Sequence, residues 1–466
     1  MRFGLDEEVV EKLIKVFEAN PKVDKAYIFG SRAKGNYRVD SDIDIALKGY
    51  QLALDDILKM SVAFDDEGIT QKIDLLDYNE IKEPALVEHI DRIGVEFYSR
   101  WKERIFSDFV LINPTVSLKG NENYSFVEMK DLHDGNKFCF PSAQRKPSSG
   151  ARFQNGDTLF ARITPCLENG KINQVAGLEN GLGFGSTEFL VFRGRPNVSD
   201  NDFVFYLSRW DEVRGFAEGH FEGTSGRQRV PRNSFNALKL ELPPLAEQTI
   251  IAAILNGLDN KIDLLHRQIK TLEQLGETLF RQWFVAEKTN TGTLGDVIDL
   301  VYGKTLKEET RSGNGFPVIG SSGLVGFHSE YLVEAPGIVI GRKGTLGKVN
   351  YQFENFYPID TTYFVKSKID SAGLFYEYFL LKTLNFEEMN SDSAVPGLNR
   401  DIALSSEINI ASSEEIKEFD RLCAVYFAKI KSNQNQVQSL TKMRNTLLPK
   451  LMSGEVRVKW NNKTLI

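Results

Sequence analysis

The stretch LPPLAEQTIIAAILNGLDNKIDLLHRQIKTLEQLGETLFRQWF, residues 242–284, decides how the rest of the chain is organised. Its apolar residues recur at alternating steps of three and four, which is the spacing of a coiled-coil seam. The seam residues are Ile251, Leu255, Leu258, Ile262, Leu265, Ile269, Leu272 and Leu279. Pro243 and Pro244 precede the run, where proline begins helices. Gly276 takes one seam position, which weakens that turn or lets a partner helix approach closely. The stretch predicts a long helix that needs a second helix beside it.

A second copy of this helix lies 168 residues further along the chain. The matched positions are Lys261 and Lys429, Ile262 and Ile430, Ile269 and Val437, Leu272 and Leu440, Leu275 and Met443, Thr278 and Thr446, and Leu279 and Leu447. Two unrelated amphipathic helices are the alternative, but so many coincident positions favour an internal duplication. Because each helix follows more than a hundred residues, the predicted order is globule, helix, globule, helix.

The charge of the chain is unevenly distributed. Its 466 residues carry a formal net charge of −7, and residues 1–98 alone hold 13 Lys and Arg against 21 Asp and Glu. The remaining 368 residues hold 44 against 43. The duplicated part is therefore nearly neutral, which is compatible with DNA binding.

Neither a membrane nor an oxidising compartment is indicated. The sequence has no run of about eighteen apolar residues and no signal-peptide pattern, so we expect a cytoplasmic protein of several domains. Cys139, Cys166 and Cys423 lack CxxC spacing. This argues against both a disulfide framework and a zinc site.

The acidic N-terminal part places two aspartates on one face of a predicted strand. Residues 41–45 read SDIDI, and side chains two apart in a strand point to the same face, so Asp42 and Asp44 project together. Two carboxylates held so close repel each other unless a cation lies between them, and hard oxygen ligands suit Mg²⁺. A further strand, residues 72–76, offers Asp74 as a third carboxylate.

A strand that ends in Gly30 and Ser31 precedes these acids. Residues 25–29 (KAYIF) form this strand, and the glycine lets the backbone approach a phosphate while the serine hydroxyl adds a donor. Gly-Ser, ten residues and Asp-x-Asp together resemble the minimal nucleotidyltransferases of the polymerase-beta-like superfamily. The resemblance covers residues 1–98, including residues 90–98, which we expect as a closing helix.

This resemblance implies a site and a reaction. Asp42 and Asp44 would hold two Mg²⁺ ions, and Asp74 would be the base or a third metal ligand. Gly30 and Ser31 would contact the phosphates of a nucleoside triphosphate, with ATP expected. The reaction would be an in-line attack on the α-phosphate. Small relatives of this type act as antitoxins that transfer AMP onto a partner protein.

The duplicated part contains two related globules rich in short predicted strands. The first reads NGDTLFARITPCLENGK at 155–171 and GTSGRQRVP at 223–231, and the second reads GIVIGRKGTLGKV at 337–349 and AVPGLNR at 394–400. Alternating β-branched and aromatic residues broken by glycine indicate short, twisted strands. With PLAEQ at 244–248, these phrases resemble the specificity subunits of type I restriction–modification systems.

The resemblance covers residues 104–466 and implies a multidomain α/β (α+β) fold. Two target-recognition domains would each read one half of a bipartite double-stranded DNA site. Two spacer helices would pair as an antiparallel coiled coil and dock methyltransferase subunits, expected to be two, together with a restriction and translocase subunit. This region would bind no cofactor and would be non-catalytic by itself. The expected domains are nucleotidyltransferase 1–98, recognition domain 104–242, helix 243–289, recognition domain 290–411 and helix 412–455.

Basic residues on glycine-rich loops are the predicted DNA contacts. Such side chains suit phosphate contact and bidentate readout of guanine, although each alone is equally consistent with a solvated surface charge. The candidates are Arg162, Lys171, Arg227, Arg229 and Arg232 in the first globule, and Arg342, Lys343, Lys348 and Arg400 in the second.

Three functions fit these features. The first is the DNA specificity subunit of a type I restriction–modification complex with an appended, Mg²⁺-dependent nucleotidyltransferase domain. The second is an enzyme that transfers AMP to protein or RNA and uses the duplicated region for DNA targeting. The third is an inactive N-terminal adaptor, against which the intact Ser31, Asp42, Asp44 and Asp74 argue.

Overall fold

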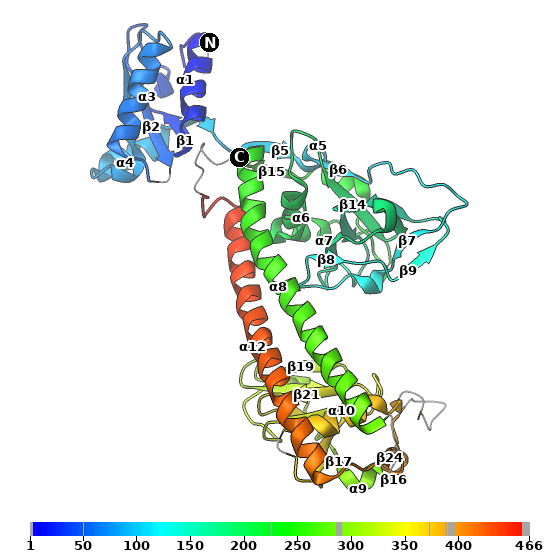
Figure 1. Cartoon of the computed structure of the whole chain (residues 1–466). Helices are drawn as coiled ribbons and strands as arrows, with labels where there is room; N and C mark the ends of the chain where they lie inside the picture. The colour runs from blue at the N-terminus through cyan, green and yellow to red at the C-terminus, as the bar shows by residue number, and fades with distance from the viewer. Residues whose placement is uncertain are drawn as a thin grey trace. The chain divides into compact units, whose positions relative to one another are not determined.

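A computed structural model of the chain (Figure 1) describes residues 3–49, 51–224, 226–285, 291–371, 373–386, 389 and 397–458. Residues 286–289 of the first predicted helix, Ser225 and residues 394–396 of the quoted phrases lie outside these ranges. The chain divides into two compact units, Met1–Asn260 with Leu440–Ile466, and Lys261–Ser439. In the part of the chain that the structure describes, no helix is both long and apolar enough to cross a membrane.

The N-terminal domain is a four-stranded sheet with helices packed on it. The strand order is β3-β2-β1-β4, with β2 and β3 parallel and the other pairs antiparallel. Apolar residues of β1 and β2 share a core with Phe17 and Phe64, which come from two of the helices. The strands are β1 (Val23–Ile28), β2 (Ile43–Gly49), β3 (Ile73–Asp77) and β4 (Val95–Ser99). The helices are α1 (Glu7–Ala19), α2 (Gly30–Lys34), α3 (Leu54–Asp66) and α4 (Pro84–Ile93).

The closing segment of this domain differs from the prediction. We expected a helix over residues 90–98, but α4 ends at Ile93 and the chain continues as strand β4. Gly94 makes the change of direction, because a Cβ at this position would lie 2.5 Å from a backbone oxygen of α4. Strand β4 then pairs with β1 and buries Phe97 and Tyr98. Tertiary pairing therefore overrides the helical pattern.

The first globule is built on two larger sheets and one small one. Their strand orders are β10-β13-β7-β9, β6-β14-β11-β12-β8 and β15-β5. The strands are β5 (Lys102–Ile105), β6 (Val110–Ile112), β7 (Tyr124–Val127), β8 (Phe138–Cys139), β9 (Ala143–Arg145), β10 (Ala151–Gln154), β11 (Thr158–Ala161), β12 (Ile172–Val175), β13 (Leu182–Gly185), β14 (Phe189–Gly194) and β15 (Lys239–Leu242). The helical segments are α5 (Phe106–Phe109), α6 (Asn201–Arg209), α7 (Asp211–Glu218) and the 3-10 turn η4 (Arg232–Asn236).

The second globule has the same kind of architecture. Its sheets have the orders β17-β23-β20-β21, β19-β18-β22 and β16-β24. The strands are β16 (Thr291–Thr293), β17 (Ile298–Tyr302), β18 (Phe316–Gly320), β19 (Gly323–His328), β20 (Gly337–Gly341), β21 (Val349–Gln352), β22 (Tyr357–Pro358), β23 (Thr362–Ser367) and β24 (Glu407–Asn409). The helices are α9 (Leu294–Val297), α10 (Phe375–Thr383) and α11 (Arg400–Leu404).

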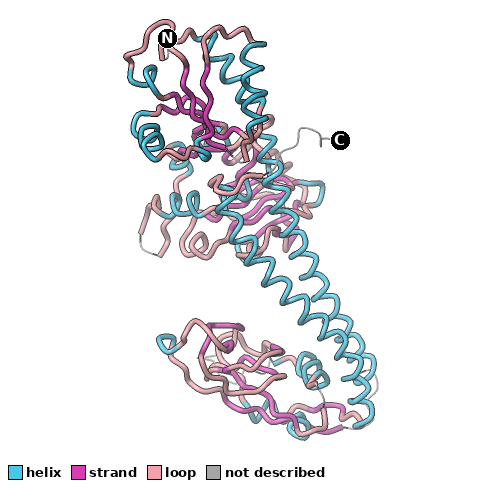
Figure 2. Tube along the Cα trace, turned by 90° about the vertical axis from the view of Figure 1, so that its left-hand side faces the viewer, coloured by secondary structure: helices cyan, strands magenta, loops and turns pink. Residues whose placement is uncertain are grey.

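Two long helices, α8 (Leu245–Phe280) and α12 (Ser413–Met452), contribute to both units and lie side by side (Figures 1 and 2). In the first unit, Leu255 of α8 shares a core with Leu451 of α12. In the second unit, Asn433 of α12 donates a hydrogen bond to Gln268 of α8 at 3.1 Å. At the end of α8, the Phe280 ring lies 5.7 Å, centroid to centroid, from the Phe419 ring near the beginning of α12. The beginning of each helix thus meets the end of the other, which is the antiparallel order that the resemblance implies.

A cluster that we call the Arg457 clamp joins the N-terminal domain to the beginning of α8. The Arg457 guanidinium lies 3.2 Å from the carboxylate of Asp24 and 3.2 Å from that of Glu247. It also stacks over the Trp101 ring, 4.6 Å from the centroid, and the Trp101 indole donates to Glu247 at 3.1 Å. Because buried charges need partners with good geometry, these contacts fix how the N-terminal domain sits on this part of the unit.

Candidate functional site

Three carboxylates of the N-terminal domain lie together where β2 and β3 begin. Asp44 and Asp74 are register partners on these parallel strands, and Asp42 directly precedes β2. Lys72 joins them, because its Nζ lies 3.0 Å from Asp42 Oδ2 and 2.9 Å from Asp74 Oδ2. The structure therefore brings together the acids that the sequence singles out, and it adds a cation.

Negative charge dominates this group. Burial, together with the charges of Asp74 and Asp42, raises the pKa of Asp44. Hydrogen bonds to Asp74 and Asp42 raise the pKa of Lys72. Three carboxylates against Lys72 and the nearby Arg32 leave a net negative charge, which suits a divalent cation. In this conformation Lys72 bridges two of the acids, and among the described residues no three His, Cys, Asp or Glu side chains converge as a ready metal-binding group.

The turn after β1 lies in close contact with Asp44. Gly30 begins α2 with φ of +70°, and a Cβ there would lie 2.1 Å from Asp44 Oδ2. A side chain is therefore excluded by both the backbone conformation and the neighbouring carboxylate. Ser31 follows and is half-buried beside the group.

Arg32 holds the segment that carries Asp42. Its side chain is 2% exposed and donates to the backbone carbonyls of Ser41 at 2.6 Å and Asp42 at 3.2 Å. Neither Arg32 nor Lys72 was predicted from the sequence. Only the contacts of these two cations with residues elsewhere in the domain reveal their roles.

Two of the predicted DNA contacts are tied to carboxylates. Arg229 donates to both carboxylate oxygens of Glu188 at 2.7 to 3.0 Å. In the second globule, Arg400 lies 2.5 Å from the carboxylate of Asp299. In this conformation each of the two arginines is therefore paired with a carboxylate, and both side chains remain partly exposed.

The other predicted contacts keep their positive charge. Arg227, Lys343 and Lys348 are exposed, and Arg342 lies over the Tyr302 ring at 5.1 Å. In the ranges that the structure describes, seven of the candidates form no ion pair with a carboxylate. These seven are Arg162, Lys171, Arg227, Arg232, Arg342, Lys343 and Lys348.

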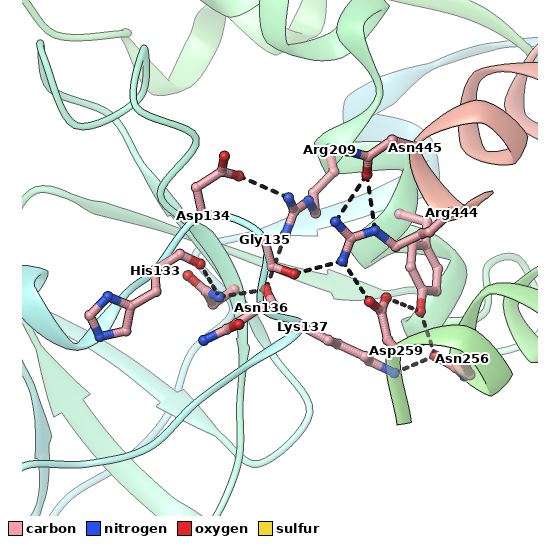
Figure 3. Close-up of polar contacts among 12 residues, drawn as sticks. His133, Asp134, Gly135, Asn136, Lys137, Arg209, Asn256, Asp259, Arg444 and Asn445 are labelled. Atoms are coloured by element: carbon pink, nitrogen blue, oxygen red, sulfur yellow. Dashed lines mark hydrogen bonds and ion pairs between the residues drawn. The ribbon is translucent and has the colours of Figure 1, made fainter. Parts of the chain in front are cut away.

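The first globule is anchored to the two long helices by a buried polar network (Figure 3). Arg444 of α12 lies 2.6 Å from Asp259 of α8, and it donates at 2.6 Å to the carbonyl of Gly135 in the globule. Tyr206 of α6 donates to Asp259 at 2.8 Å, and Lys137 lies 2.9 Å from Asp202. Burial, and then the Asp259 charge, raise the pKa of Tyr206, so its hydroxyl remains a donor.

The second globule is anchored at the corresponding place by aromatic rings. Phe427 lies 168 residues after Asp259, and Gly276 lies 168 residues before Arg444. Phe379 of α10 fills the space over Gly276, where a Cβ would lie 2.4 Å from its ring, and its centroid is 5.8 Å from that of Phe427. The glycine in the seam thus admits a ring from the globule. The matched positions of the two copies therefore carry a polar anchor in the first half and an apolar one in the second.

The sequence model of the type I restriction modification DNA specificity domain matches two segments, residues 100–274 and 286–442, which together exceed half of the chain. The chain belongs to the type I restriction modification DNA specificity family. In addition, residues 11–103 match the model of polymerase beta nucleotidyltransferases. The N-terminal domain of this family member is therefore a nucleotidyltransferase domain, and both resemblances seen in the sequence are confirmed.

Several type I restriction enzyme specificity subunits are similar to this chain. It is 29% identical over 220 residues to the EcoAI specificity subunit of Escherichia coli, covering 45% of this chain and 37% of that protein. It is 24% identical over 326 residues to the MjaVIII specificity subunit of Methanocaldococcus jannaschii, covering 59% and 75%. A crystal structure of the S subunit from M. genitalium aligns at a TM-score of 0.47 and 19% identity, covering 76% and 96%. The chain spans well under half of the EcoAI subunit.

Proposed function

We propose that this chain is the DNA specificity subunit of a type I restriction–modification complex and recognises a bipartite double-stranded site. The two matches to one family, each on a globule joined to its own helix, carry this proposal. The first globule, residues 104–242, reads one half-site, and the second, residues 290–411, reads the other. Helices 243–289 and 412–455 set the distance between them.

Unpaired cations on the globules support DNA binding. Arg227 in the first globule, and Lys343 and Lys348 in the second, are exposed and lack a carboxylate partner among the described residues. Such groups contact phosphates or the guanine edge. Arg229 and Arg400 remain predicted DNA contacts, and Glu188 and Asp299 pair with them in this conformation.

Partners complete the activity. The paired helices present two related surfaces, and each would dock one methyltransferase subunit, while a restriction and translocase subunit supplies cleavage. Methylome sequencing of cells that carry the chain with its neighbouring methyltransferase tests the proposal. A methylated motif of two short parts separated by a constant number of free bases is expected. Methylation without sequence preference would overturn it.

The N-terminal domain supports a second function, transfer of a nucleotide, with ATP as the expected donor and a protein or RNA as acceptor. Two contacts favour it: Asp44 and Asp74 are register partners on neighbouring strands, and Asp42 and Asp74 share the Lys72 ammonium. Asp42 and Asp44 would hold Mg²⁺, which when bound stabilises charge on the phosphate oxygens. Ser31 would donate to a phosphate beside Gly30, and Asp74 would accept the proton of the attacking hydroxyl or serve as a further ligand. A labelled-nucleotide assay tests this function separately from DNA binding.

A further inference from the structure

A cleft in the first globule brings Arg232 together with Arg193 and Arg195, which lie two residues apart at the end of β14. It lies between α5, β6, the end of β14 and η4, and it has a volume of about 780 Å³. Its lining includes Arg193, Arg195 and Arg232, and the asparagines Asn233 and Asn236 extend the polar wall beside the last of these. The cleft is therefore rich in hydrogen-bond donors.

Among the described residues, a carboxylate pairs with just one of the three arginines. Arg193 donates through Nε and Nη2 to Asp157 at 2.6 and 2.7 Å. The Asp157 side chain is fully buried, so the pair is a fixed part of the wall. This bidentate contact neutralises Arg193.

The other two arginines keep their charges inside the cleft. Arg195 donates through Nη2 to the carbonyl of Ser107 at 2.7 Å, while its Nε is buried and has no partner. Arg232 donates to the carbonyl of Ile112 at 2.8 Å. A carbonyl cannot neutralise a guanidinium, and a buried N–H without an acceptor is unfavourable. An anion with several acceptor oxygens, bound in the cleft, would accept hydrogen bonds from the remaining N–H donors of both guanidinium groups.

We propose that this cleft binds a phosphate group, with Arg195 and Arg232 as its principal ligands. A phosphate presents oxygens in several directions, so it can accept hydrogen bonds from guanidinium groups that approach from different elements of the fold. The same chemistry has two sources, a phosphate of a DNA strand or a free phosphate compound. In the first case the inference rests on the proposed function, because the cleft would then position the strand without reading its bases.

The test compares four full-length proteins, wild type, Arg232→Gln, the double variant Arg195→Gln with Arg232→Gln, and the control Arg152→Gln. Arg152 is exposed in β10 and outside the cleft, so this control removes a positive charge from the same globule. Arg232 is exposed, and its single variant keeps the test valid if loss of Arg195 disturbs folding. One arm titrates inorganic pyrophosphate by calorimetry. The other measures duplex DNA affinity against salt concentration.

The outcomes distinguish a DNA phosphate from a free phosphate compound in the cleft. They also distinguish failure of the cleft proposal from failure of the proposed DNA-binding function. A DNA strand in the cleft predicts that the double variant lowers the slope of log affinity against log salt by about 0.9, the value of one phosphate contact. A free phosphate ligand predicts that pyrophosphate binding weakens at least tenfold while the DNA slope stays unchanged. Identical behaviour of the cleft variants and Arg152→Gln in both arms would overturn the inference. If the wild type binds no DNA at all, the proposed function fails, and the pyrophosphate arm alone decides on the cleft.

Discussion

The guanidinium of Arg444 lies 2.6 Å from the carboxylate of Asp259, and the two side chains are only 3% and 2% exposed. Such a pair is stable only while both members are present, because either one alone leaves an unpaired charge in the interior. The contact joins the two long helices at the place where the first globule rests on them. The free energy of unfolding of this unit should therefore depend strongly on this pair.

Removing one member of this pair should destabilise the first unit strongly. We expect Arg444→Ala to lower the free energy of unfolding by about 3–5 kcal/mol, because Asp259 stays buried and unpaired. Chemical denaturation followed by tryptophan fluorescence measures the change. Arg267→Ala is the matched control, since its pair with Asp263 is 70% exposed on the arginine side, and it should cost less than about 1 kcal/mol.

Replacing the polar anchor of the first half by the apolar anchor of the second half should restore part of the free energy of unfolding that Arg444→Ala removes. The triple variant Arg444→Gly, Asp259→Phe and Tyr206→Phe reproduces the apolar set of Gly276, Phe427 and its facing ring. We expect it to be more stable than Arg444→Ala, because it buries no unpaired charge. The same denaturation assay decides. A triple variant no more stable than the single one would show that the two anchors are not equivalent.

The N-terminal carboxylates should be essential for nucleotide transfer. We expect Asp42→Asn and Asp44→Asn each to abolish Mg²⁺-dependent label transfer from ATP, since each removes a ligand charge. Chelation with EDTA should do the same to the wild type, whereas DNA binding should persist in all cases. Asp40→Asn, an exposed aspartate nearby, is the control and should remain active. Failure of the wild type to transfer label from any of the four nucleoside triphosphates, with its genomic neighbours present, would leave the adaptor hypothesis.

The cations of the two globules should serve different half-sites. Arg227→Ala should weaken binding through the half-site of the first globule, and Lys343→Ala through that of the second, because the duplication assigns one globule to each. A base contact predicts a loss of about 1–3 kcal/mol at one position of the site. Competition with duplexes altered in one half at a time separates the effects. If both variants lost discrimination in the same half, this assignment would be wrong.

The two long helices should set the number of base pairs between the two half-sites of the DNA. Helix α8 has 36 residues and is therefore about 54 Å long. Seven residues inserted at facing seam positions of α8 and α12 keep the seam in register and add about 10 Å, or roughly three base pairs. Methylome sequencing should then reveal a spacer longer by about three bases. An unchanged spacer would show that the helices do not set it.

The long helices and the acidic site were predictable because their signals are local or periodic. The seam repeats every three or four residues, and the Asp42 and Asp44 pair follows from the two-residue period of a strand. The partners of the arginines were not predictable. Arg229 meets Glu188, which is 41 residues away, and no periodic pattern encodes such a contact. The prediction that Arg229 contacts DNA therefore rested only on its position in a glycine-rich loop.

The anchors show a similar limit. Gly276 was recognised as a weak point of the seam, but the ring that fills it comes from Phe379, more than a hundred residues further on. Strand β4 was mistaken for the end of a helix because its pairing with β1 lies outside any local window. In each case the contact that decides the structure is made between distant parts of the chain.

The Arg457 clamp breaks the near-symmetry of the molecule. Globule and helix occur twice, but within the described ranges Arg457 joins Asp24 and Trp101 at the beginning of α8, and no such group lies at the beginning of α12. If two methyltransferase subunits dock on the repeats as proposed, their surroundings differ, because one of them has the nucleotidyltransferase domain as its neighbour. The complex would then be asymmetric. Any nucleotide transfer by that domain would modify one of two otherwise identical subunits.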